Sequence, residues 1–65
     1  MEILLWQARQ DKGWTLERLE RESGVSKSTL QRIESGETSP TLDSMEKIAR
    51  ALNTSISSLY ESEYK

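Results

Sequence analysis

Residues 15–36 read TLERLERESGVSKSTLQRIESG, and this run is the most informative about the fold. Apolar side chains recur in both halves of the run at helical rather than alternating spacing. Gly24 separates the halves, in a turn where the chain reverses and a positive φ suits a residue without a Cβ. A turn this short sets two helices at about 90–120° to each other. We therefore expect two short crossed helices whose contact is made by four apolar residues: Leu19, Val25, Leu30 and Ile33.

The rest of the chain also has the punctuation of short helices. Residues suited to helix N-caps and residues suited to left-handed helix ends alternate along it. The expected caps are Thr15, Ser26, Thr41 and Ser55, and the expected ends are Gly13, Gly24, Gly36 and Asn53. The spacing of Met1, Leu4, Leu5 and Ala8 predicts a first helix from the start of the chain. No segment of five or more residues predicts a strand, so five short helices are expected.

Length and composition narrow the classes of function. The chain has 65 residues, enough for one small domain, and contains neither cysteine nor histidine. It therefore lacks disulfides, thiolate metal ligands and the commonest general base. It also has no phosphate-binding loop, so we expect no enzyme, no cofactor and no metal. The longest apolar run, residues 3–6, is too short for a membrane span or a signal peptide, which favours a cytoplasmic protein.

The formal net charge of −2 is not that of a basic nucleic-acid tail. It leaves room for a local basic face, because groove binding depends on where the charges lie.

The linked motifs along the chain resemble the Cro/phage-repressor helix-turn-helix family, from about Leu4 to Tyr60. The matching stretches are Thr15–Leu19, Ser23–Ser26, Ser28–Leu30, Arg32–Gly36, Ser39–Leu42, Ile48–Leu52 and Ile56–Leu59. The resemblance implies an all-α, lambda-repressor-like bundle of five short helices. It implies a single DNA-binding domain over residues 1–65, with the helix-turn-helix at about residues 16–35 and the third helix in the major groove.

Two positions depart from the family pattern. Glu20 stands where the family usually has alanine, at the close contact of the crossed helices, so its carboxylate must swing outward or widen the crossing. Leu16 stands where phage repressors often have a glutamine that touches a phosphate, and leucine cannot make that hydrogen bond.

The outward positions of the third helix are the candidate base-reading residues: Lys27, Ser28, Gln31 and Arg32. Recognition helices contact base edges from their N-terminal turns, Arg and Lys suit guanine, and Gln suits adenine. The alternative is an ordinary solvated helix face.

Hydroxyls near helix starts and in the loop after the third helix are candidate phosphate contacts, with N-capping as the alternative. They are Thr15, Ser26, Thr29, Thr38 and Ser39, and Glu37 in the same loop counts against a close approach of phosphate.

Other charged residues are expected to form ion pairs. Glu17 with Arg21, and Glu46 with Arg50, are spaced i, i+4 in the favourable order on the surface. The resemblance further implies a buried ion pair between Arg9 and Glu34, which ties the recognition helix to the scaffold.

Two functions fit these observations. The first is a sequence-specific regulator of transcription that binds double-stranded DNA, as a homodimer on a palindromic operator. The second is an antitoxin or anti-regulator that acts mainly through protein contacts. On a helical wheel Ile3 and Trp6 fall together, opposite the core face of the first helix. Either the C-terminal segment with Leu59 and Tyr60 covers them within the chain, or a second subunit does.

Overall fold

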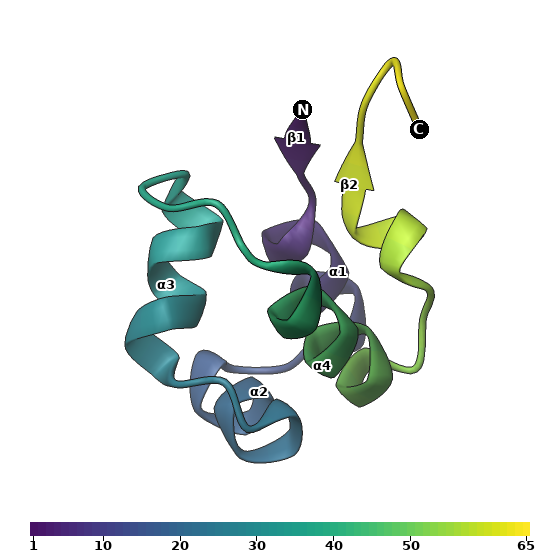
Figure 1. Ribbon diagram of the computed structural model, residues 1–65. Helices are drawn as coiled ribbons and strands as arrows, with labels where there is room; N and C mark the ends of the chain where they lie inside the picture. Colours follow the sequence, from purple (N-terminus) through teal and green to yellow (C-terminus); the bar gives the residue numbers. More distant parts are fainter.

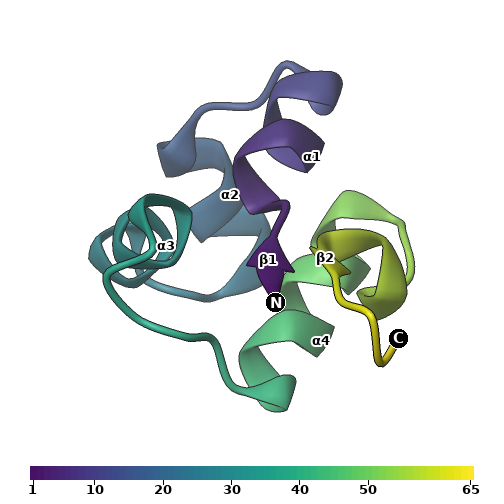
Figure 2. The same cartoon turned by 90° about the horizontal axis from the view of Figure 1, so that it is seen from above.

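Four α-helices pack around one apolar core, and a computed structural model describes all 65 residues (Figures 1 and 2). The elements follow in the order β1 (Glu2–Ile3), α1 (Leu5–Lys12), α2 (Leu16–Ser23), α3 (Lys27–Ser35), α4 (Leu42–Leu52), the 3₁₀ helix η1 (Ile56–Leu59) and β2 (Tyr60–Glu61). In both views α3 lies at one edge of the molecule, and the two ends of the chain lie near each other. None of the helices has the length and apolar character that crossing a membrane requires.

Side-chain caps fix the starts of three helices where the sequence predicts them. Thr15 accepts a hydrogen bond from the Arg18 amide at 3.1 Å, Ser26 from the Thr29 amide at 3.3 Å, and Thr41 from the Ser44 amide at 3.0 Å. Each bond satisfies an amide that has no partner within its own helix. The boundaries of α2, α3 and α4 therefore follow from local sequence.

Left-handed residues end the helices. Gly24 ends α2 with φ at 79°, which confirms the positive φ expected at the turn between α2 and α3. Asn53 ends α4 with φ at 54°, a conformation that asparagine tolerates better than most residues. These two reversals direct α3 across α2, and the last segment back along α4.

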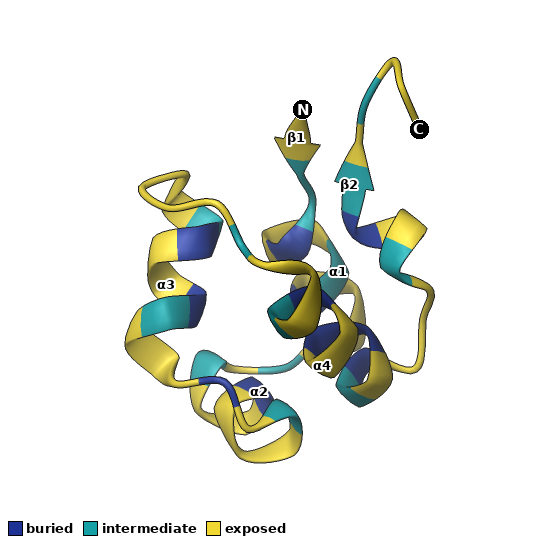
Figure 3. Cartoon of the chain, viewed as in Figure 1, coloured by how far each residue is buried: buried dark blue, intermediate teal, exposed yellow.

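The core draws on every helix. Figure 3 shows the buried faces of the helices turned toward one another. The buried apolar residues are Leu5, Leu19, Val25, Leu30, Ile33, Met45, Ile48, Ala49, Leu52 and Leu59. They include the four residues expected at the crossing of α2 and α3. That crossing is therefore part of the main core and holds α3 in a fixed orientation.

The start of the chain differs from the expectation of a helix from Met1. Residues 2 and 3 form β1, which pairs antiparallel with β2, with Glu2 opposite Glu61 and Ile3 opposite Tyr60. The Leu4 amide donates to the Leu59 carbonyl at 2.8 Å, and α1 begins only at Leu5. Pairing with a segment more than fifty residues away decides this conformation, and helical spacing could not reveal it. Ile3 is covered from within the chain, whereas Trp6 is 52% exposed.

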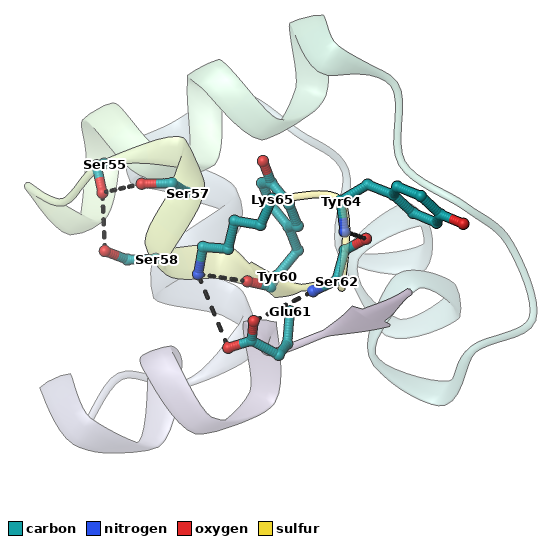
Figure 4. Close-up of polar contacts among 8 residues, drawn as sticks. All are labelled: Ser55, Ser57, Ser58, Tyr60, Glu61, Ser62, Tyr64 and Lys65. Carbon is teal, nitrogen blue, oxygen red and sulfur yellow. Dashed lines mark hydrogen bonds and ion pairs between the residues drawn. The ribbon is translucent and has the colours of Figure 1, made fainter.

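The fifth helix is a 3₁₀ turn rather than an α-helix, and the chain has four α-helices, not five. Ser55 makes no capping bond, and its hydroxyl lies 2.8 Å from that of Ser58. The residues after η1 fold back on themselves. Lys65 Nζ donates to the Tyr60 carbonyl at 3.0 Å and lies 3.9 Å from the Glu61 carboxylate (Figure 4).

Candidate nucleic-acid interface

Helix α3 has one buried face and one open face. Leu30 and Ile33 are buried in the core, while the four candidate base-reading residues are all exposed (Figure 3). These are Lys27, Ser28, Gln31 and Arg32, at successive helical positions i, i+1, i+4 and i+5. Ser35 continues the same stripe and is also exposed, although no motif in the sequence pointed to it. The helix therefore presents a short polar ridge on the outside of the molecule.

A buried ion pair helps to set the orientation of α3. Arg9 Nε lies 2.7 Å from Glu34 Oε2, and Arg9 Nη1 donates to the Trp14 carbonyl at 2.8 Å. The hydrogen bond to Glu34 raises the pKa of the Arg9 guanidinium above its ordinary value. The pair links α1 to the C-terminal half of α3, and the bond from Arg9 to the Trp14 carbonyl holds the turn that leads into α2.

Glu20 swings outward instead of widening the helix crossing. It is exposed, and its carboxylate accepts a hydrogen bond from the Lys27 amide at 2.8 Å. A carboxylate at the start of a helix is stabilised by the free amides and by the helix dipole. Glu20 of α2 thus occupies one of the donors at the start of α3 that an incoming phosphate could otherwise use.

Glu17 pairs with Lys27 and not with Arg21, so the expected i, i+4 pair is wrong. Lys27 Nζ lies 2.6 Å from Glu17 Oε2, whereas the closest carboxylate to Arg21 is that of Glu22, at 3.9 Å. The hydrogen bond between Glu17 and Lys27 lowers the pKa of Glu17 and raises the pKa of Lys27. The crossing of α2 and α3 brings these residues together across ten positions, which within-helix spacing could not indicate. The other expected surface pair, Glu46 with Arg50, is present at 3.9 Å.

The candidate phosphate contacts fall into two groups at opposite ends of α3. Thr15, Ser26 and Thr29 lie near the starts of α2 and α3, where Thr15 and Ser26 cap their helices and Ser26 donates to the Thr29 hydroxyl at 2.8 Å. Thr38 and Ser39 are exposed in the loop after α3, about 13 Å away along the axis of a nine-residue helix. The structure does not bring the five hydroxyls together.

The cations near α3 differ in their surroundings. None of the six ion pairs of the chain includes Arg32, so its guanidinium is the uncompensated charge of the ridge. Arg18, an exposed residue of α2, stacks over the Trp14 ring at 4.3 Å from its centroid. The Lys27 ammonium group is paired with Glu17, while Glu20 accepts from the Lys27 backbone amide. Arg32 is therefore the cation best placed to meet a ligand.

Comparisons with known proteins agree with this geometry. A family model described as helix-turn-helix matches residues 7–59. The HTH-type transcriptional regulator SutR of Escherichia coli (strain K12) is 49% identical over 53 residues, 82% of this chain and 30% of that protein. The HTH-type transcriptional regulator SinR of Bacillus subtilis (strain 168) is 33% identical over 60 residues, 91% of this chain and 54% of that protein.

A solved structure is similar over most of the chain. The N-terminal DNA binding domain of SinR from Bacillus subtilis superimposes with a TM-score of 0.82 at 31% identity. The match covers 94% of this chain and 90% of that domain. The chain thus spans nearly all of a solved DNA-binding domain, but only about a third to a half of the full-length regulators that it matches.

Proposed function

The chain belongs to the helix-turn-helix family of Cro and phage-repressor type, and we propose that it is a sequence-specific regulator of transcription that binds double-stranded DNA. In this proposal α3 lies in the major groove, and Ser28, Gln31 and Arg32 contact base edges. Lys27, the fourth candidate for a base contact, is engaged by the Glu17 carboxylate. The protein acts by binding, without catalysis, in the cytoplasm. The curated relatives SutR, SlrR and SinR are named as transcriptional regulators.

The outer ridge of α3 is the observation that carries the proposal. It combines Gln31, which suits adenine, with the unpaired guanidinium of Arg32, which suits guanine. The packing of Leu30 and Ile33 and the Arg9–Glu34 pair fix the ridge to the scaffold. Direct reading of bases needs such fixed side chains, because hydrogen bonds to base edges require correct placement.

Contacts with the DNA backbone are proposed at both ends of the ridge. The loop after α3 carries Thr38 and Ser39, which are exposed and free of the capping role of Thr15 and Ser26. Phosphate contacts fix register without reading sequence. We assign the larger share of the phosphate contacts to the loop, because the carboxylate of Glu20 already occupies a backbone amide at the start of α3.

Selection of bound sites from a pool of random duplexes tests the function. We expect enrichment of one short motif. The logarithm of the binding constant should fall linearly with the logarithm of salt concentration, because phosphate binding releases counterions. Recovery of random sequences, with weak binding at every salt concentration, would contradict the proposal.

A second copy of the chain and a palindromic operator complete the proposal. Half-sites about 34 Å apart place two recognition helices on one face of the DNA. A groove with seven apolar residues among ten supports such a contact, since it carries the exposed side chains of Met1, Leu42 and Tyr64. Exposed apolar clusters often mark association surfaces. Trp6, on α1, lies outside this groove and is the alternative contact.

An antitoxin or anti-regulator acting through protein contacts is the second candidate. The net charge of −2 and the carboxylates of Glu17 and Glu20 beside the start of α3 favour it. Such a module would bind duplex DNA weakly and without sequence preference. The selection experiment above therefore distinguishes the two functions.

A further inference from the structure

We infer that Glu17 is a specificity-determining residue of the DNA-binding surface, which holds Lys27 away from non-specific phosphate contacts; this rests on the proposed function. Glu17 and Glu20 lie on α2, and both point to Lys27 at the start of α3. Glu17 Oε2 lies 2.6 Å from Nζ, and Glu20 accepts from the backbone amide at 2.8 Å. The three residues together carry a net charge of −1.

The ion pair is exposed, so it can exchange partners. The Lys27 and Glu17 side chains keep 47% and 63% of their surface accessible. An exposed ion pair of this kind is weak, and a phosphate or a guanine can compete for the ammonium group. When Lys27 leaves, however, the Glu17 carboxylate remains unpaired beside the negatively charged DNA. Every contact that Lys27 makes with DNA therefore carries this electrostatic penalty.

The penalty affects non-specific binding most. Affinity for arbitrary sequences comes almost entirely from cations near phosphates, whereas a preferred site adds hydrogen bonds to bases. Lys27 is one of only two cations on α3, the other being Arg32. Restraining one of two cations removes a large part of the sequence-independent attraction of this helix. The base contacts of Gln31 and Arg32 are left intact, and the ratio of specific to non-specific affinity rises.

The test is a double-mutant cycle with E17Q, K27M and the double variant. Affinities are measured for a random-sequence duplex of about two helical turns and for the selected site. E22Q is the matched control, because it removes a carboxylate from the same helix that contacts Arg21 and not Lys27. We expect E17Q to tighten binding to the random duplex about twofold to fivefold, the range that the strength of an exposed ion pair allows. Affinity for the specific site should rise less. The slope of the logarithm of affinity against the logarithm of salt concentration should steepen by about 0.9, as expected for one added phosphate contact.

The effect must depend on Lys27. In the K27M background, E17Q should improve binding no more than E22Q does, since only the general loss of negative charge remains. NMR titration provides a readout without DNA: K27M should raise the pKa of Glu17 toward its ordinary value, while the E22Q variant leaves it lowered.

Two results would overturn this inference and leave the proposed function standing. One is an equal gain from E17Q with and without Lys27, and the other is an unchanged Glu17 pKa in K27M. If the wild-type chain bound no duplex at low salt, the proposed function and this inference would fail together. The outcomes therefore separate an error about Glu17 from an error about DNA binding.

Discussion

Arg9 of α1 and Glu34 of α3 form a two-pronged ion pair, with Nε 2.7 Å from Oε2 and Nη2 2.9 Å from Oε1. Both side chains are about nine-tenths buried, and a third bond from Arg9 reaches the Trp14 carbonyl. The planar guanidinium matches the carboxylate in this geometry, and a lysine could not replace it. Together with the buried Leu30 and Ile33, the pair sets the orientation of α3 on the core.

Loss of one partner of this pair should strongly destabilise the fold. Glu34→Ala leaves the Arg9 charge buried without its partner, which costs about 3–5 kcal/mol of unfolding free energy. Denaturant unfolding measures the difference. The control is Glu46→Ala, which removes an exposed pair with 3.9 Å separation and should cost about 0.5 kcal/mol or less. Equal unfolding curves for the two variants would contradict a structural role for the buried pair.

Base reading should depend on the ridge of α3. Arg32→Ala and Gln31→Ala should each cost about 1–3 kcal/mol of binding free energy and relax the preference at particular base pairs. Titration of each variant against the selected site and its single-base variants measures both effects. Lys47→Ala serves as the control, because Lys47 lies on α4 and pairs with Asp43 at 3.3 Å. If both ridge variants kept wild-type affinity and preference, α3 would not read bases through these side chains.

The Glu17–Lys27 pair should give a stability contribution that disappears in acid. A carboxyl group whose pKa is lower in the folded chain stabilises the fold above its unfolded pKa of about 4.3. That contribution is lost as the pH falls through the folded pKa. Lys27 has a raised pKa in the folded chain, so it stabilises the fold below its unfolded pKa of about 10.4. That stabilisation is lost as the pH rises through the folded pKa of Lys27.

Wild type and E17Q should therefore differ most between about pH 5 and pH 10 and converge in acid. Unfolding of both proteins across that range, with E22Q as the control, measures the difference. A gap between wild type and E17Q that persisted in strong acid would point to a cause other than this ion pair.

Gly24→Ala should destabilise the chain through backbone conformation alone. The left-handed conformation, with φ at 79°, costs a residue with a Cβ about 1–2 kcal/mol. A Cβ at this position meets no atom within 4 Å, so no steric clash adds to the cost. Thermal unfolding measures the effect, with Asn53→Gly as a control that relieves rather than creates left-handed strain. A loss above about 4 kcal/mol would mean that the turn is more tightly packed than it is in this structure.

Dimer formation should depend on one of two apolar surfaces. Leu42→Glu places a charge in the groove that Met1 and Tyr64 also line, and Trp6→Glu places one on α1. We expect Leu42→Glu to abolish a concentration-dependent dimer and Trp6→Glu to leave it unchanged, as measured by sedimentation with and without a palindromic duplex. The reverse pattern would assign the contact to α1. A monomer at all concentrations, with equal affinity for single half-sites and palindromes, would contradict the dimer.

The helices of the motif and their ends follow from local sequence. Caps such as Thr15, Ser26 and Thr41 act within one helical turn, and left-handed stops act at a single residue, so local sequence contains their whole cause. The apolar spacing likewise marked the residues buried where α2 and α3 cross. The partners Arg9 and Glu34 came from the family resemblance, but their two-pronged geometry and burial come from the structure.

The contacts that join distant parts of the chain depend on the folded path of the backbone. Glu2 and Ile3 form a strand instead of a helical turn because Tyr60 and Glu61 lie beside them and accept this pairing. Glu17 pairs with Lys27 instead of Arg21 because the crossing of two helices brings their side chains within 2.6 Å. Such contacts depend on the path of the backbone between the partners, and that path is set only when the core closes around it.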